Sequence, residues 1–277
     1  MRQRGLGIVG AVVGLCAACN SYSSANDVVA SDAGGDAPAP AALDGGRDAS
    51  ALPVDDRGCP KGRGASMVRV DDGPASFCID ATEATGADYL AFLDSGPSPT
   101  SQAPRCAWNT SFVLPSPPDA NAAVQVNHCD AVAYCAWAGK RLCGKRGGGH
   151  LETLGEWKDP AVSEWTAACS RNGSRSFAYG NAFDAGACNT AADGGVTGPK
   201  SFPGCEGGYP GIFDLSGNAV EWEDNCIPGA SDAAAPNEHC EVRGAGVGFA
   251  RLRSCTDGAG VGAGESYGVR CCATPAL

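Results

Sequence analysis

The first apolar stretch of the chain is short and follows positive charge. Arg2 and Arg4 precede an apolar run from Leu6 to Leu15, and small residues come after it. This order is typical of a secretory signal peptide, and the run is too short to cross a bilayer as a helix. We predict a signal peptide over residues 1–18, which takes no part in the fold.

No hydrophobic period follows the signal. Residues 19–57 are rich in alanine, glycine, aspartate and proline, and such a segment cannot bury enough apolar area to offset the entropy that ordering costs. We predict that it is a disordered acidic tether and that residues 58–277 form a single folded domain.

Within the folded part, helical spacing of apolar residues recurs three times, each time behind a residue that can cap a helix. The capping residues are Thr85, Asn127 and Ser163, whose side-chain oxygens can accept from the first helical N–H groups. The first two helices are expected to end at Gly96 and Gly139. Glycine and proline recur between these segments, which limits other regular elements to short ones.

The same spacing predicts which helix faces are buried. In the second helix three residues share the expected inward face: Val132, Cys135 and Ala136. In the third helix the inward positions are Trp165, Ala168 and Cys169.

The cysteine content indicates an oxidising compartment. The chain has 16 cysteines in 277 residues, and they lack the paired spacing of structural zinc sites. The signal ends on Ala17, Ala18 and Cys19, which resembles a bacterial lipobox whose cysteine is acylated. We expect an exported protein held in the cell envelope by a lipid on Cys19.

Two details of the anchor leave alternatives open. Cys16 follows the bulky Leu15 and fits acylation less well than Cys19, yet it stands where a lipobox usually has leucine. A plain secretion signal is therefore the alternative. Asn20 follows Cys19 where an inner-membrane retention signal would have aspartate, which favours the outer membrane.

Charge argues against one class of partner. The formal net charge is −11, and such a field repels the phosphate backbone of nucleic acids. We expect no nucleic-acid partner.

Seven segments, in this order, resemble successive signature blocks of one family. They are CIDATEATGADYLAFL (78–93), VNHCDAVAYCAWAGKRL (126–142), SEWTAAC (163–169), YGNAFDAGACN (179–189), GIFDLSGNAVEW (211–222), VRGAG (242–246) and YGVRC (267–271). The family is that of the formylglycine-generating enzymes, or sulfatase-modifying factors, of which this chain looks like a divergent lipoprotein member. The resemblance implies a single irregular α+β domain similar to C-type lectins, rich in disulfides and poor in regular secondary structure.

The resemblance also supplies two disulfides, Cys135 with Cys271 and Cys169 with Cys255, each closing a long loop worth roughly 4 to 5 kcal/mol in the chain-entropy model. Proximity in sequence suggests four more: Cys59 with Cys78, Cys106 with Cys129, Cys188 with Cys205, and Cys226 with Cys240. Spacing alone does not fix connectivity, and the pairing of Cys143 and Cys272 stays open. The adjacent Cys271 and Cys272 could form a redox pair or belong to two different bridges.

One turn resembles a calcium site of the family. The matching ligands are the side chains of Asp214 and Glu221 and the carbonyls of Gly217 and Ala219, because a hard divalent cation prefers several oxygens. In the alternative interpretation, Glu221 only closes the turn through hydrogen bonds. A second family calcium site would begin at Asn189 and Thr190, with Asp193 as a further candidate ligand.

The three histidines do not form a zinc motif. His128, His150 and His239 show no ligand spacing, so we expect surface or capping roles for them.

Two functions remain. The family's enzymes use copper(I), held by two reduced thiolates shortly after an R-G-G-S segment, to convert a sulfatase cysteine to formylglycine. Here the run after Arg243 has no cysteine before Cys255, the serine is replaced by Gly246, and a family tryptophan is replaced by Val220. We therefore expect no copper, and a non-catalytic binding or structural module whose ligand is a carbohydrate, a peptide or an envelope protein. The copper-dependent oxidase is the alternative. The sequence also leaves open a different reaction in the same pocket.

Overall fold

The structure is a computed structural model that describes residues 53–114, 119–190, 195–227, 238–246 and 254–276. These residues belong to one unit, Asp48–Leu277. The predicted signal peptide, Cys19 and residues 19–52 of the predicted tether lie outside the described residues. None of the described helices is long and apolar enough to cross a membrane.

The three predicted helices form behind their predicted caps. The side chain of Thr85 caps α1 (Gly86–Asp94), Asn127 caps α2 (His128–Trp137), and Ser163 caps α4 (Glu164–Ser170). Gly139 follows α2 with φ of 70°, and the N–H of Lys140 donates to the carbonyl of Cys135, as in a Schellman C-terminus. The caps and the glycine were therefore sufficient to predict where these helices begin and where α2 ends.

Two features of the helices differ from the prediction. In α2, Ala136 is exposed, and the buried face is formed by Ala131, Tyr134 and Cys135. The face is rotated because Tyr134 packs against α1. A further helix, α3 (Leu154–Lys158), is capped by Thr153 in a stretch where none was predicted.

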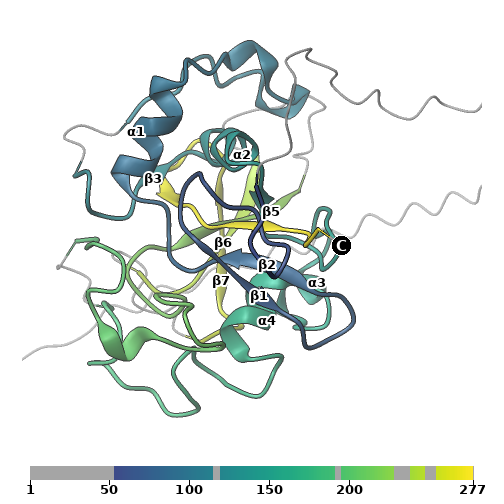
Figure 1. Ribbon diagram of the computed structural model, residues 1–277, viewed down its shortest axis with the longest axis vertical. Coiled ribbons are helices and arrows are strands. Elements are labelled where there is room, and N and C mark those ends of the chain that lie inside the picture. The colour runs from purple at the N-terminus through teal and green to yellow at the C-terminus, as the bar shows by residue number, and fades with distance from the viewer. Residues whose placement is uncertain (1–52, 115–118, 191–194, 228–237, 247–253, 277) are drawn as a thin grey trace, which may run out of the picture. The chain divides into compact units, whose positions relative to one another are not determined.

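Short strands form two sheets (Figure 1). The first has the order β1 (Met67–Val70), β2 (Phe77–Asp80), β9 (Cys271–Ala273), β4 (Arg141–Leu142). The second has the order β3 (Gln125–Val126), β8 (Tyr267–Gly268), β5 (Glu221–Ile227), β6 (His239–Arg243), β7 (Gly258–Gly262). All pairs are antiparallel except β5 with β8. Three short 3₁₀ helices, Pro99–Ser101, Pro104–Cys106 and Pro203–Cys205, lie in the connections.

The core has two main parts that meet the two sheets. One contains Trp222 of β5, which packs against His128 and Tyr267, together with the aromatic residues Tyr89, Phe92 and Tyr134 of α1 and α2. In the other, Trp165 of α4 packs with Phe77 and Ile79 of β2 and with Leu215. The mixed α/β class with few helices is thus confirmed.

Seven disulfides join the described elements. They are Cys59–Cys78, Cys106–Cys129, Cys135–Cys271, Cys143–Cys272, Cys169–Cys255, Cys188–Cys205 and Cys226–Cys240. They include the six pairs expected from the sequence, and the open pair Cys143–Cys272 completes the set. The neighbours Cys271 and Cys272 therefore belong to two different bridges.

Candidate functional site

A buried arginine organises the turn that resembles a calcium site. The Arg270 guanidinium is fully buried and donates to both carboxylate oxygens of Glu221 at 2.8–3.0 Å. The indole N–H of Trp165 donates to the same carboxylate at 2.7 Å. Arg270 also donates to the carbonyls of Asp80 and Phe213, so it ties β2 to the turn. These contacts fix Glu221 at the start of β5.

Two more carboxylates share this guanidinium. Glu83 is fully buried, and its Oε1 accepts from Asn218 and from the N–H of Ala219. Its Oε2 has no hydrogen-bond partner among the described residues and lies 3.9 Å from Arg270. Asp214 is 3 % exposed and accepts from the N–H of Lys200. Arg270, Glu83, Asp214 and Glu221 are called the Arg270 cluster below. With Lys200, whose charge also acts on Asp214, two cations stand against three carboxylates, which leaves an excess of negative charge.

Burial disfavours that excess. It raises the pKa of Glu83 well above its usual range, and the nearby charge of Asp214 raises it further. Burial also raises the pKa of Asp214. The excess must be neutralised by protons or by a cation, because uncompensated buried charge is costly.

The Arg270 cluster fits calcium in part. The net charge and the unpartnered oxygen of Glu83 suit a divalent cation. Asp214 has φ of 68°, and it begins the turn that contains Gly217 and Ala219. Glu221, however, is engaged by Arg270 and Trp165, in line with the alternative that it closes the turn through hydrogen bonds.

The structure describes two of the three residues expected at the second calcium site. The amide of Asn189 donates to the carbonyl of Gly195 and to Asn218. Thr190 is half-buried next to it. Asp193 lies outside the described residues.

The structure describes only part of the segment that corresponds to the family's copper-binding segment. Residues 247–253 lie outside the described part, but their sequence contains no cysteine. Cys255, which follows them, is fully buried and bonded to Cys169. All fourteen cysteines in the described ranges are paired. No described thiolate is therefore available to a soft metal ion while these bonds are intact.

The place of the family's serine is closed by the backbone. A Cβ atom at Gly246 would lie 2.6 Å from the N atom of Val220 and 2.9 Å from its Cγ2. Real Cβ atoms do not approach so closely, so a serine would force the two segments apart. Gly246 and Val220 therefore pack directly against each other, and a larger residue at position 246 needs a shift of the segment around Val220.

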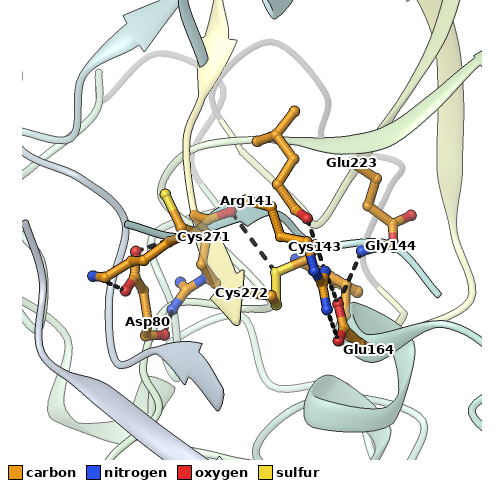
Figure 2. Close-up of a disulfide and its surroundings, with 12 residues drawn as sticks. Asp80, Arg141, Cys143, Gly144, Glu164, Glu223, Cys271 and Cys272 are labelled. Carbon is orange, nitrogen blue, oxygen red and sulfur yellow. Dashed lines mark hydrogen bonds and ion pairs between the residues drawn. A yellow bond between two sulfur atoms is a disulfide. The ribbon is translucent and has the colours of Figure 1, made fainter. Parts of the chain in front are cut away.

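Buried charges also surround the Cys143–Cys272 bond (Figure 2). Arg141 donates to both oxygens of the fully buried Glu164, at 2.5 and 2.6 Å, and the N–H of Gly144 donates to the same carboxylate. On the other side, Asp80 accepts from Lys140 at 2.6 Å and from the N–H of Cys271. These groups are paired, which favours a structural role for this region.

Glu223 is the exception among them. It accepts from Ser163 at 2.9 Å and lies 3.5 Å from Arg243, yet no group in the described ranges donates a hydrogen bond to its Oε2. Burial outweighs the attraction of Arg243 and raises the pKa of Glu223 to about 7. The carboxyl thus binds a proton in the folded state at a pH where it has lost it in the unfolded chain.

We predict from this shift that folding stability falls as pH rises. The contribution of Glu223 is fully present below its unfolded pKa and is lost as pH passes through about 7. Between pH 5 and 8 the wild-type protein should lose on the order of 3 kcal/mol of its free energy of unfolding through Glu223, and Glu223→Gln should remove this loss. Urea unfolding with intact disulfides measures it, and Asp94→Asn, at an exposed position, is the control. If the free energy of unfolding changed with pH equally in the wild type and in Glu223→Gln, the raised pKa would not belong to Glu223.

The histidines differ from the expectation in one case. His150 is half-buried and hydrogen-bonds to Asp224, and His239 is exposed. His128, by contrast, is 1 % exposed, and burial together with the nearby charge of Arg105 lowers its pKa to about 4. It is therefore a neutral ring in the core, not a surface residue.

Comparison with known proteins supplies the family. The profile of a family described as "Sulfatase-modifying factor enzyme 1-like domain" matches residues 65–274. No curated protein matches the chain. Among solved structures, "Structure of PvdO from Pseudomonas aeruginosa" is similar with 19 % identity and a TM-score of 0.48, over 76 % of this chain and 90 % of that one. "Crystal Structure of CarF" is similar with 17 % identity and a TM-score of 0.49, over 82 % and 100 %.

Proposed function

Since this chain belongs to the sulfatase-modifying factor enzyme 1-like family, we propose that it is a member that keeps the fold and has lost the oxidase chemistry. It serves as a non-catalytic binding or structural module of the cell envelope. The observation that carries this proposal is the bond between Cys169 and Cys255. This bond occupies Cys255, the first cysteine after the position where the family holds its copper ligands.

The closed position of Gly246 supports the same proposal. An enzyme that activates oxygen needs room for its substrate beside the metal, whereas here Gly246 and Val220 are in close contact. The fold is held by disulfides and by the Arg270 cluster, neither of which needs a substrate. Loss of catalysis is thus compatible with a stable domain.

The test combines a thiol count with an activity assay. We expect no free thiols on the native, lipid-anchored protein and no formylglycine when a C-x-P-x-R peptide is supplied with copper(I), oxygen and a thiol reductant. Restoring the family serine by Gly246→Ser should destabilise the domain by about 1–3 kcal/mol through overpacking and give no activity. Gly180→Ser is the matched control, because no described atom lies within 4 Å of the place its Cβ would take. Two accessible thiols together with aldehyde product would establish the oxidase instead.

The anchor is part of the proposal. A lipid on Cys19 and the acidic tether would hold the domain off the membrane, where it could meet a carbohydrate, a peptide or an envelope protein. The mature protein should partition with membranes, and Cys19→Ser should release it. Wild-type protein without lipid mass in the soluble fraction would refute the anchor.

We also propose that the Arg270 cluster takes up calcium through Asp214 and the adjacent turn. Millimolar calcium should then raise the melting temperature of the metal-stripped protein by a few degrees, because a ligand that binds only the folded state stabilises it. Asp214→Asn keeps an oxygen and tolerates the positive φ, so the response should persist; Asp214→Gly tolerates the φ but removes the ligand, so the response should vanish. A wild-type protein that does not respond would count against the site.

A further inference from the structure

A histidine and two cysteines from distant parts of the chain meet in the core. Cys226 of β5 lies directly opposite Cys240 of β6, and the two form a disulfide. A ring nitrogen of His128 and the two sulfur atoms all lie within 4.8 Å of one another, and the three residues are buried. Imidazole together with two thiolate sulfurs is the donor set of many zinc sites.

The imidazole is held in place with one nitrogen unused. His128 is the first residue of α2, and its backbone N–H donates to the carbonyl of Ala263. The ring packs edge-on against Trp222 at 5.3 Å between ring centres. Nε2 has no partner within the described part of the chain, although the residue is 1 % exposed.

The unused nitrogen is suited to bind a cation. The neutral imidazole that carries its proton on Nδ1 has a free lone pair on Nε2. A buried acceptor without a donor is costly, and a ligand would remove that cost.

We propose that reduction of the Cys226–Cys240 bond turns this cluster into a zinc site, with a ring nitrogen of His128 and the two thiolates as ligands. An external dithiol supplies the two electrons and two protons: it becomes a disulfide while Cys226 and Cys240 become thiols. Zinc then displaces both thiol protons. The fourth tetrahedral position is left for water.

Charge favours zinc over copper(I) in this place. Two thiolates and a neutral imidazole balance the charge of Zn²⁺, whereas copper(I) would leave a net negative charge. A neutral complex is preferred in the core, because buried charge is costly. Both ions accept sulfur and imidazole ligands, so the ligand types alone do not select one of them. The selection comes from burial, which favours the neutral zinc complex.

The surrounding structure can tolerate the opening of this bridge. Of the seven disulfides it spans the shortest sequence separation, 14 residues. The strands it joins are also held by the antiparallel pairing of β5 with β6, and β6 pairs with β7 along its whole length. Reduction therefore needs only local opening at the end of the hairpin.

The test measures zinc-dependent protection of named cysteines. The oxidised mature protein is treated with limiting dithiol, freed of reductant under anaerobic conditions, and alkylated with or without zinc. Peptide mass mapping then reports each cysteine. We expect one zinc per chain and at least tenfold lower alkylation of Cys226 and Cys240 when zinc is present. Cobalt(II) in place of zinc should give the charge-transfer absorption of thiolate ligands.

Variants separate the site from general reduction. His128→Gln should weaken zinc binding at least tenfold, His150→Gln should leave it unchanged, and the Cys226→Ala/Cys240→Ala pair, which keeps His128, should abolish it. Equal alkylation with and without zinc would overturn the proposal. So would zinc binding that survives the loss of both cysteines, or a bridge that opens only when the tryptophan fluorescence shows global unfolding.

Discussion

Replacing Arg270 with methionine is expected to lower the free energy of unfolding by about 3–5 kcal/mol, because it leaves the buried Glu83 and Glu221 without their ion-pair partner and removes a compensating charge near Asp214. Arg270→Met keeps most of the side-chain volume. The lost free energy of unfolding therefore comes mainly from charge and hydrogen bonding, and less from packing. Urea unfolding at neutral pH, with the disulfides intact, is the measurement.

Acid should rescue the Arg270→Met protein in part. Protonated carboxyls need no counter-charge, and the pKa values of Glu83 and Asp214 are already raised by burial, so the deficit should shrink as pH falls toward 5. Arg69→Met is the control. It removes a partly exposed ion pair with Asp71, and such pairs contribute about 0–1 kcal/mol. A deficit for Arg270→Met no larger than that of the control would show that Arg270 does not carry the charge balance of these carboxylates, and that protons or another cation do.

The local parts of this fold were predictable from sequence. A cap depends on one side chain and the next few N–H groups, so Thr85, Asn127 and Ser163 could be identified as helix caps from the sequence. The inward positions of α4 were also correct, since Trp165, Ala168 and Cys169 are all fully buried. The family's blocks could be recognised because each is a short, contiguous segment.

Periodicity failed where burial depends on distant residues. Ala136 was placed in the core by its spacing, but the face of α2 is set by the aromatic contacts of Tyr134 with Tyr89 and Phe92 of α1. The turn 214–221 was identified, whereas the role of Arg270 was not, since its carboxylate partners lie up to 187 residues away in sequence. Long-range charge pairing leaves no local pattern.

His128 shows the same limit at a candidate site. The sequence offers no zinc motif, because His128 is far from Cys226 and Cys240, which are themselves 14 residues apart. Only the pairing of β5 with β6, and the packing of α2 against Trp222, bring them together. In a domain with so little regular structure, disulfides and buried ion pairs connect segments that long helices and sheets would connect elsewhere.

The disulfides are not independent of one another. Cys135 and Cys143 are eight residues apart, and they bond to the neighbours Cys271 and Cys272. With one of these two bridges in place, the other closes a ring of only about nine residues. With both removed, the Cys169–Cys255 bridge still shortens the freed loop to about 50 residues, counted from Cys135 to Cys169 and from Cys255 to Cys271. The two bridges should therefore partly substitute for each other.

Either pair alone, Cys135→Ala/Cys271→Ala or Cys143→Ala/Cys272→Ala, is thus expected to cost roughly 3 kcal/mol, and all four substitutions together roughly 7 kcal/mol. The combined loss exceeds the sum because only the fourfold variant frees the long loop. That loss is comparable to the whole stability of a typical domain, about 5–15 kcal/mol, so the fourfold variant should be largely unfolded at 37 °C. Guanidinium unfolding of the oxidised proteins measures these losses of free energy of unfolding. Cys59→Ala/Cys78→Ala is the control: its bridge spans a separate loop, so its loss should add to that of either other pair. If the two single-bridge losses simply added, the bridges would be acting independently, and the account of a shared loop would be wrong.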